Sequence, residues 1–160
     1  MRQTHRLNRG VWLFVDWLEF SGVELDPTFP RVHSTLGWAF MKLGMTARGV
    51  AALEEAVRLS PGDTLFLGQL AQAYGIAGQP DRARDVLRQM DELSRGRYVS
   101  PYHFAYGYVG LGESDRAMDY LERAARELAG GVFGIKGSFL FASLHSHPRF
   151  QALLRQMNLA

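Results

Sequence analysis

The stretch "PYHFAYGYVGLGESDRAMDYLERAA" at residues 101–125 decides the fold, because its spacing recurs earlier in the chain. Gly112 is the last of four glycines spaced 34 residues apart, after Gly10, Gly44 and Gly78. Other residue types follow the same period without gaps: Phe40, Tyr74 and Tyr108; Leu36, Leu70 and Phe104; Gly49, Ala83 and Ala117; Leu53, Leu87 and Leu121. Several independent series with one period indicate an internal structural repeat.

Each repeat is predicted to be a pair of helices joined by a tight turn. The glycines at 44, 78 and 112 stand where the first helix must end, because glycine tolerates a left-handed backbone. The second helices begin with acidic residues such as Asp81 and Asp115, which suit a helix N-terminus. We expect first helices at about 31–43, 65–77 and 101–111, second helices at about 47–59, 81–94 and 115–129, and no strand.

With these residue types, the 34-residue unit resembles the tetratricopeptide repeat, a helix–turn–helix unit. The resemblance is carried by Leu36-Gly37-x2-Phe40, Leu70-Ala71-x2-Tyr74 and Phe104-Ala105-x2-Tyr108, although His33, Leu67 and Pro101 replace the family's first tryptophan. It implies an all-α, right-handed superhelix of antiparallel helix pairs. The single domain over residues 1–160 would hold a partial repeat (10–29), three full repeats (30–63, 64–97 and 98–131) and a variant repeat with a capping helix (132–160).

Residues 98–159 resemble the end of tetratricopeptide modules that are appended to bacterial signalling proteins, such as transcription regulators, nucleotide cyclases and serine/threonine kinases. The matching segments include Tyr98-Val99-Ser100-Pro101 and Pro148-Arg149-Phe150. The sequence departs from this pattern at residues 137–143, "GSFLFAS". The resemblance implies that the chain is a docking or sensor part of a larger bacterial regulator.

The composition indicates an ordinary globular protein, with 47% apolar and 21% charged residues. A net charge of +2 without a basic tail predicts no nucleic-acid partner. The absence of cysteine excludes disulfides and thiol nucleophiles. The apolar run near the N-terminus is interrupted by Asp16 and Glu19, so it is too short for a signal peptide or a membrane span. We therefore expect a cytoplasmic protein without a membrane partner.

No residue pattern indicates catalysis. Gly107, Gly110 and Gly112 imitate a phosphate loop, but they close a helix, whose C-terminal dipole disfavours an anion. His145 and His147 have too few neighbouring ligands for zinc, so a solvated loop is favoured. The sequence predicts no enzyme, no cofactor and no metal site. A small-molecule-binding or enzymatic domain is the least favoured alternative.

The inner face of the first helices is the predicted working surface. Tyr102, Tyr106 and Val109 share one helix face, opposite Phe104 and Tyr108 in the repeat core. By alignment with the family, the groove residues are Arg31, Thr35, Trp38, Met41, Lys42, Gln69, Gln72, Tyr102, His103, Tyr106 and Val109. Aromatic side chains beside amides and basic groups suit a peptide that carries apolar side chains and some negative charge. The alternative is that the variant tail or the N-terminal helix covers these residues.

A second functional class is self-association. A helix at about residues 11–22 would be apolar nearly all round, and such a helix must be buried on more than one side. Its large side chains are Trp12, Phe14, Trp17 and Phe20. Either residues 1–10 cover this helix, or another chain does, or the sequence is a piece of a longer protein. Exposed apolar surface marks interfaces, so a homodimer formed through this helix is the alternative to a module that binds a peptide or protein.

Overall fold

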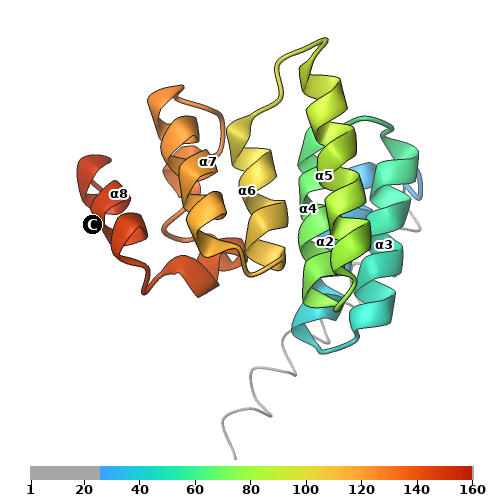
Figure 1. Cartoon of the computed structure of the whole chain (residues 1–160). Helices are drawn as coiled ribbons and strands as arrows, with labels where there is room; N and C mark the ends of the chain where they lie inside the picture. The colour runs from blue at the N-terminus through green and yellow to red at the C-terminus, as the bar shows by residue number, and fades with distance from the viewer. Residues whose placement is uncertain (1–25, 160) are drawn as a thin grey trace, which may run out of the picture. The chain divides into compact units, whose positions relative to one another are not determined.

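The computed structural model describes residues 26–159, which fall into two compact units divided between Phe66 and Leu67. Every described element is helical, which confirms the all-α prediction for this part of the chain. The elements are α2 (Pro30–Lys42), α3 (Thr46–Leu59), α4 (Thr64–Ile76), α5 (Pro80–Ser94), α6 (Pro101–Gly110), α7 (Ser114–Arg126), η2 (Val132–Gly134), η3 (Phe139–Leu144) and α8 (Pro148–Gln156) (Figure 1). These bounds follow the predicted helices closely, except that α7 ends three residues early.

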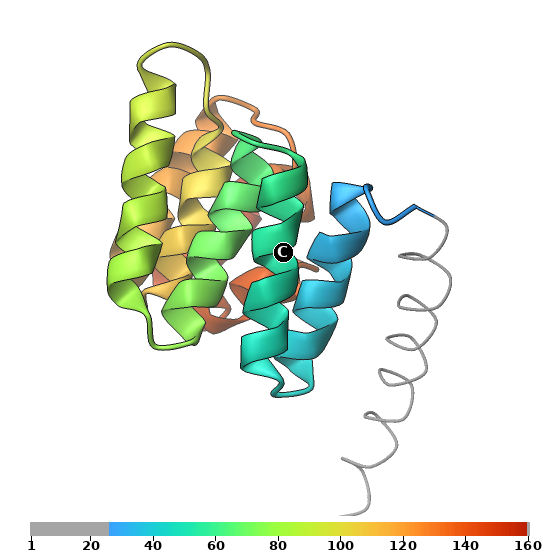
Figure 2. The same cartoon turned by 90° about the vertical axis from the view of Figure 1, so that its right-hand side faces the viewer.

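In the first unit, α2 and α3 form an antiparallel pair (Figure 2, blue and teal). Their core is the cluster of Leu36, Ala39 and Phe40. The helices approach closely at Gly37, where an added Cβ would lie 2.7 Å from the Leu53 side chain and 3.0 Å from the Gly49 carbonyl oxygen. A small residue is therefore required at this position of the pair.

The glycine series marks the end of each first helix. Gly44, Gly78 and Gly112 have φ angles of 76°, 73° and 72°. In each case the next amide donates a 2.9 Å hydrogen bond to the carbonyl five residues before it, which pairs Met45 with Phe40, Gln79 with Tyr74, and Glu113 with Tyr108. This is the left-handed helix stop that glycine favours, so the sequence period corresponds to a repeated piece of backbone geometry.

A second contact also recurs with the period. The guanidinium carbon of an arginine on each second helix lies over an aromatic ring on the first helix. The distances to the ring centroid are 4.0 Å for Arg48 over Phe40, 4.1 Å for Arg82 over Tyr74, and 5.6 Å for Arg116 over Tyr108. Cation–π contacts of this kind help to hold the two helices of a pair together.

In the second unit, α4 and α6 meet backbone to backbone. An added Cβ on Gly68 would lie 2.3 Å from the carbonyl oxygen of His103, and one on Gly75 would lie 2.3 Å from that of Gly110. Gly107 instead faces side chains, since an added Cβ would lie 2.7 Å from the side chain of Leu87 and 3.1 Å from the Cβ of Ala71. Gly107 and Gly110 of α6 therefore serve helix packing.

The tail continues the second unit as a packed cap. η3 contacts α6, whereas η2 and α8 contact α7. Its apolar side chains are buried at Val132, Ile135, Phe141, Leu144 and Phe150, all of which have no exposed surface. A terminal element that covers the last apolar face is what a solenoid requires.

Arg149 fastens α8 to α7. Its Nε donates to Glu122 at 2.9 Å, and its Nη2 donates to Asp119 at 2.7 Å. The imidazole Nδ1 of His147 caps α8 by accepting a 3.3 Å hydrogen bond from the Arg149 amide. His147 Nε2 also lies 3.4 Å from Asp115. His147 therefore helps to anchor the start of α8.

This anchor makes stability depend on pH. The Arg149 hydrogen bond lowers the pKa of Glu122 below its ordinary value of 4.5. A lowered carboxylate pKa contributes stability above the unfolded pKa, and that stability is lost as the pH falls through the folded pKa. Because both side chains are about one-third exposed, we expect Arg149→Gln to cost about 1 kcal/mol near neutral pH. The cost should shrink towards about pH 3, as measured by urea unfolding across the pH range.

Arg155→Gln is the matched control, because Arg155 is an exposed arginine on the same helix. Its unfolding midpoint should follow that of the wild type at every pH. If the difference in free energy of unfolding between Arg149→Gln and the wild type stays constant down to the lowest pH, the ion pair of Arg149 with Glu122 is not the cause of the loss.

Candidate functional site

The inner face of the second unit is filled by the chain's own tail. Gln72, Tyr102 and Tyr106 are only 2%, 5% and 5% exposed. The Phe141 ring stacks on Tyr106 at 5.1 Å between centroids and 15° between planes, and it packs on Tyr102 at 5.3 Å. Gln72 Nε2 donates to the carbonyl oxygen of Leu140 at 2.7 Å. These three residues are therefore not accessible to a peptide in the structure, because η3 covers this face.

Burial sets the chemistry of this face. Removal from water raises the pKa of Tyr106 far above its ordinary value, and it raises that of Tyr102 as well. Both phenols stay neutral at physiological pH, and their mutual hydrogen bond lies inside the core. The two tyrosines therefore act as packing residues beneath the tail.

The other groove residues are distributed between the two units. Gln69, His103 and Val109 are half-buried in the second unit. In the first unit, Trp38 is buried, Met41 is half-buried, and Arg31, Thr35 and Lys42 are exposed. The candidates for self-association, Trp12, Phe14, Trp17 and Phe20, lie outside the described residues. The structure thus brings together Gln72, Tyr102 and Tyr106, but it does so as part of a core.

A cleft of about 290 Å³ opens instead among α5, α6 and α7. Three stacked aromatic rings form part of its lining. The Tyr120 ring stacks on that of Phe104, at 5.0 Å between centroids and 17° between planes, and on that of Tyr108, at 5.2 Å and 15°. Leu87 and Leu111 add apolar surface. Tyr108 and Tyr120 are half-buried, so this aromatic stack reaches the solvent. We call this site the outer cleft.

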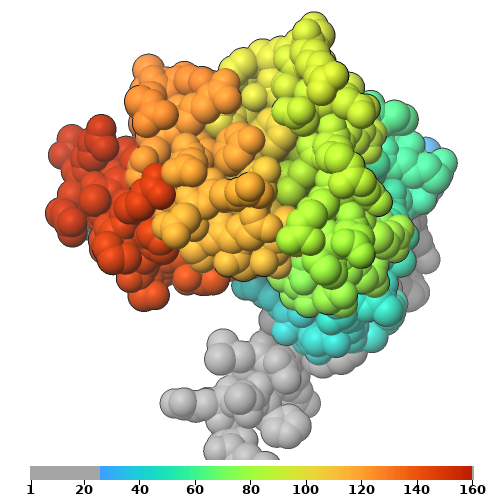
Figure 3. All heavy atoms as spheres, in the orientation of Figure 1, coloured from blue at the N-terminus to red at the C-terminus, as the bar shows by residue number. Residues whose placement is uncertain are grey.

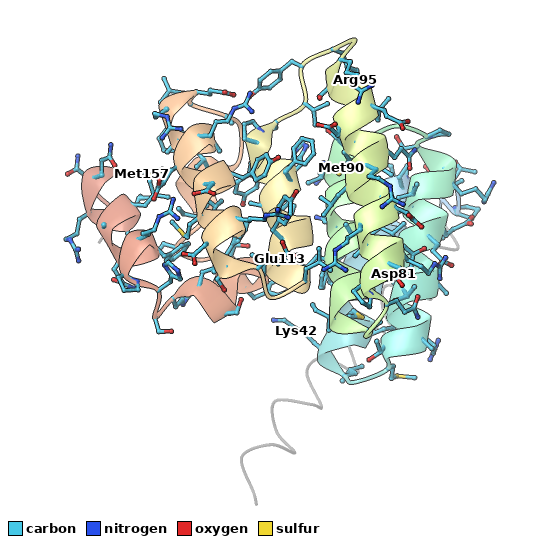
Figure 4. The ribbon with its side chains drawn as sticks, in the orientation of Figure 1. Lys42, Asp81, Met90, Arg95, Glu113 and Met157 are labelled. Carbon is cyan, nitrogen blue, oxygen red and sulfur yellow. The ribbon has the colours of Figure 1, made fainter. Side chains whose placement is uncertain are left out.

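Charged side chains complete the outer cleft. Glu113 accepts a hydrogen bond on each carboxylate oxygen, from Arg84 at 3.1 Å and from Arg116 at 3.0 Å. Figure 4 shows the labelled Glu113 between α7 and α5. Arg88 pairs with Asp85, and Asp91 also lines the site. Figure 3 shows the same face as spheres, with α5 in yellow-green and α6 and α7 in gold to orange.

Comparison of the repeats with one another explains why this cleft exists. The position of Arg84 is taken by Val50 in the first repeat and by Met118 in the third, and both of these are buried. Tyr120 stands where the other repeats have Ala52 and Val86. A charged residue thus replaces a packing residue on α5, and an aromatic replaces a small one on α7.

Sequence reasoning did not identify the outer cleft, because it considered only the inner face of the first helices. The signal was present in the sequence, since Arg84 and Tyr120 both depart from the residue types found 34 positions away. In the other repeats these positions serve packing. A residue of another type at such a position therefore indicates surface that does not take part in packing the repeat.

The described residues offer no metal site, because no group of three or more His, Asp and Glu is placed to hold an ion among them. Between residues 26 and 159 no helix is long and apolar enough to cross a membrane. What the geometry does define is a helical-repeat fold that is built of antiparallel helix pairs.

The family comparison makes this more specific. Residues 30–63 match the model of the tetratricopeptide repeat, and they are the residues predicted to form the first full repeat. The chain therefore contains a tetratricopeptide repeat, and its consecutive helix pairs form a fold of the tetratricopeptide solenoid type. Such repeats generally mediate protein–protein interaction and are typically not catalytic. No curated protein matches the chain.

Proposed function

We propose that this protein is an interaction module that holds a segment of another protein, and that in residues 67–159 the segment lies in the outer cleft. The observation that carries the proposal is the aromatic stack of Phe104, Tyr120 and Tyr108, in which the half-buried Tyr108 and Tyr120 reach the solvent beside three arginines. Aromatic and arginine side chains are the types most enriched at the energetic centres of protein interfaces.

Two further observations support the choice of the outer cleft over the inner face. Tyr102 and Tyr106 already have a stacking partner in Phe141, so a ligand would have to displace a buried segment to reach them. The outer cleft is not filled by other parts of the second unit, because its volume is about 290 Å³. A partner segment can therefore enter without unfolding any element of the second unit.

The test is Tyr120→Ala. Random short peptides are selected by display against the wild-type protein, and the affinities of the selected peptides are measured by fluorescence anisotropy. We expect the variant to bind them about tenfold or more weakly, because an aromatic anchor at the centre of an interface is worth about 1–2 kcal/mol or more. The fold should persist, since the first repeat carries Ala52 at this position.

Tyr98→Ala is the matched control, because Tyr98 is an exposed tyrosine of the same unit that does not line the outer cleft. It should bind the selected peptides as the wild type does. If wild type and Tyr120→Ala bind the peptides equally and both keep a cooperative thermal transition, the outer cleft is not the binding site.

In the first unit, the partner contacts the exposed side chains of α2, which are Arg31, Thr35 and Lys42. The role as the docking part of a larger bacterial regulator is also part of this proposal, and it rests on the resemblance of residues 98–159. Self-association through Trp12, Phe14, Trp17 and Phe20 stays a separate prediction, which light scattering on the full chain tests.

A further inference from the structure

We infer that the outer cleft recognises an Asp or Glu side chain of the partner segment next to an apolar side chain, and that the partner's carboxylate exchanges with Glu113 for Arg84 and Arg116. This inference rests on the proposed function and specifies its ligand. The partner is a protein segment that carries acidic and apolar side chains next to one another.

The geometry at Glu113 is that of a carboxylate bridging two arginines. Oε1 accepts from Arg84 Nη2 at 3.1 Å, and Oε2 accepts from Arg116 Nη1 at 3.0 Å. Arg84 comes from α5 and Arg116 from α7, so the carboxylate joins the two sides of the cleft. Glu113 thus marks a position at which a carboxylate satisfies both guanidinium groups.

An incoming carboxylate can reach these arginines. The side chains of Arg84 and Arg116 are 50% and 65% exposed. An ion pair at such exposure contributes little net stability, so exchanging one carboxylate for another costs the fold little. The affinity gained comes from charge-assisted hydrogen bonds, which are stronger where the bound segment excludes water, and these must outweigh the cost of desolvating the arginines.

The charge of the outer cleft favours an acidic ligand. Its lining contains three arginines against two carboxylates, Asp91 and Glu113, but Arg88 pairs with Asp85 outside the lining. Asp91 lies 3.8 Å from Arg95, which is outside the lining. Arg84 and Arg116 then share a single carboxylate, that of Glu113, so an incoming carboxylate meets an excess of one positive charge. Complementary charge of this kind steers association and sets specificity.

The repeats supply an internal control for this assignment. Glu113 stands where the other repeats have Met45 and Gln79, and Arg84 stands where they have Val50 and Met118. Neither charge is part of the repeat, yet the two contact each other across the cleft. The apolar part of the ligand follows from the remaining lining, where Leu87, Leu111 and the aromatic stack offer a surface for an aliphatic or aromatic side chain.

The experiment uses the full chain and the peptides selected on the wild type. A selected peptide is compared with its copy in which every Asp and Glu is replaced by Asn or Gln. We expect acidic residues to be enriched beside apolar ones in the selection, and the neutral copy to bind about tenfold more weakly. We also expect affinity for the acidic peptide to fall steeply with salt.

Two variants test the roles of the individual residues. Arg84→Val should lower the affinity for the acidic peptide about tenfold. Its melting temperature should be unchanged or higher, since valine is the residue of the first repeat at this position. Glu113→Gln should raise the affinity for the acidic peptide severalfold, because the competing carboxylate is gone. Its affinity for the neutral copy should equal that of the wild type. Weaker binding of the acidic peptide by Glu113→Gln would overturn the exchange.

The outcomes separate this inference from the proposed function. Selected peptides that depend on Tyr120 but carry no acidic bias would refute the carboxylate recognition and leave the outer cleft as the binding site. Selected peptides that are insensitive to Tyr120 would refute both.

Discussion

Phe141→Ala is expected to lower the free energy of unfolding of the second unit by about 3–5 kcal/mol, the range for truncating a buried phenylalanine. Phe141 has no exposed surface, and it packs on both Tyr102 and Tyr106. Its loss removes the ring contacts and leaves a cavity between η3 and α6. The measurement is urea unfolding followed by far-UV circular dichroism.

A second readout reports on the inner face directly. Burial raises the pKa of Tyr106 in the wild type. When the Phe141 ring is removed, water reaches this phenol. The pKa of Tyr106 should then fall towards the ordinary tyrosine value of about 10. Spectrophotometric titration of the tyrosines detects this change in any Phe141→Ala protein that remains folded.

Phe139→Ala is the control within the same segment, because Phe139 is 46% exposed. It should cost less than about 1 kcal/mol, as surface substitutions do. A similarly small cost for Phe141→Ala would mean that η3 is a loose cover. The inner face would then be accessible to a partner, and the sequence-based groove would regain its place as the binding site.

The described helices could be predicted from sequence because the 34-residue period reports on local backbone geometry. Gly44, Gly78 and Gly112 identify the helix stops, since a left-handed backbone is required at each of them. The residues that face the partner helix, such as Gly37 and Leu53, recur with the same period because each pair packs in the same way.

The state of the inner face could not be predicted in the same way. Helical spacing places Tyr102 and Tyr106 opposite the packing residues of α6, but it does not show what lies over that opposite face. The covering segment contains residues 137–143, which depart from the family pattern and form part of the irregular tail around η3. Contacts such as Gln72 with Leu140, which are 68 residues apart, depend on how that segment folds back.

Gly110→Ala is expected to cost about 3 kcal/mol, the upper part of the usual range for overpacking, because the added methyl group would meet backbone atoms. Its Cβ would lie 2.4 Å from the carbonyl oxygen of Gln72 and 2.5 Å from the Cα of Gln72. A side chain could rotate away from such a contact, but a helix backbone cannot. The substitution must therefore push α4 and α6 apart, which also loosens the packing of Gln72 beneath the tail.

Two further variants test this reason for the loss, with thermal and urea unfolding as the measurements. Gly130→Ala is the control, because an added Cβ there has no neighbour within 4 Å, and it should stay within about 0.5 kcal/mol of the wild type. Gly75→Ala places a methyl group 2.3 Å from the Gly110 carbonyl oxygen, on the opposite side of the same contact. Because either methyl group alone separates the helices, the double variant should cost clearly less than the sum of the two single variants. Additive losses would show that the two glycines act at separate contacts and would contradict a single close approach of α4 and α6.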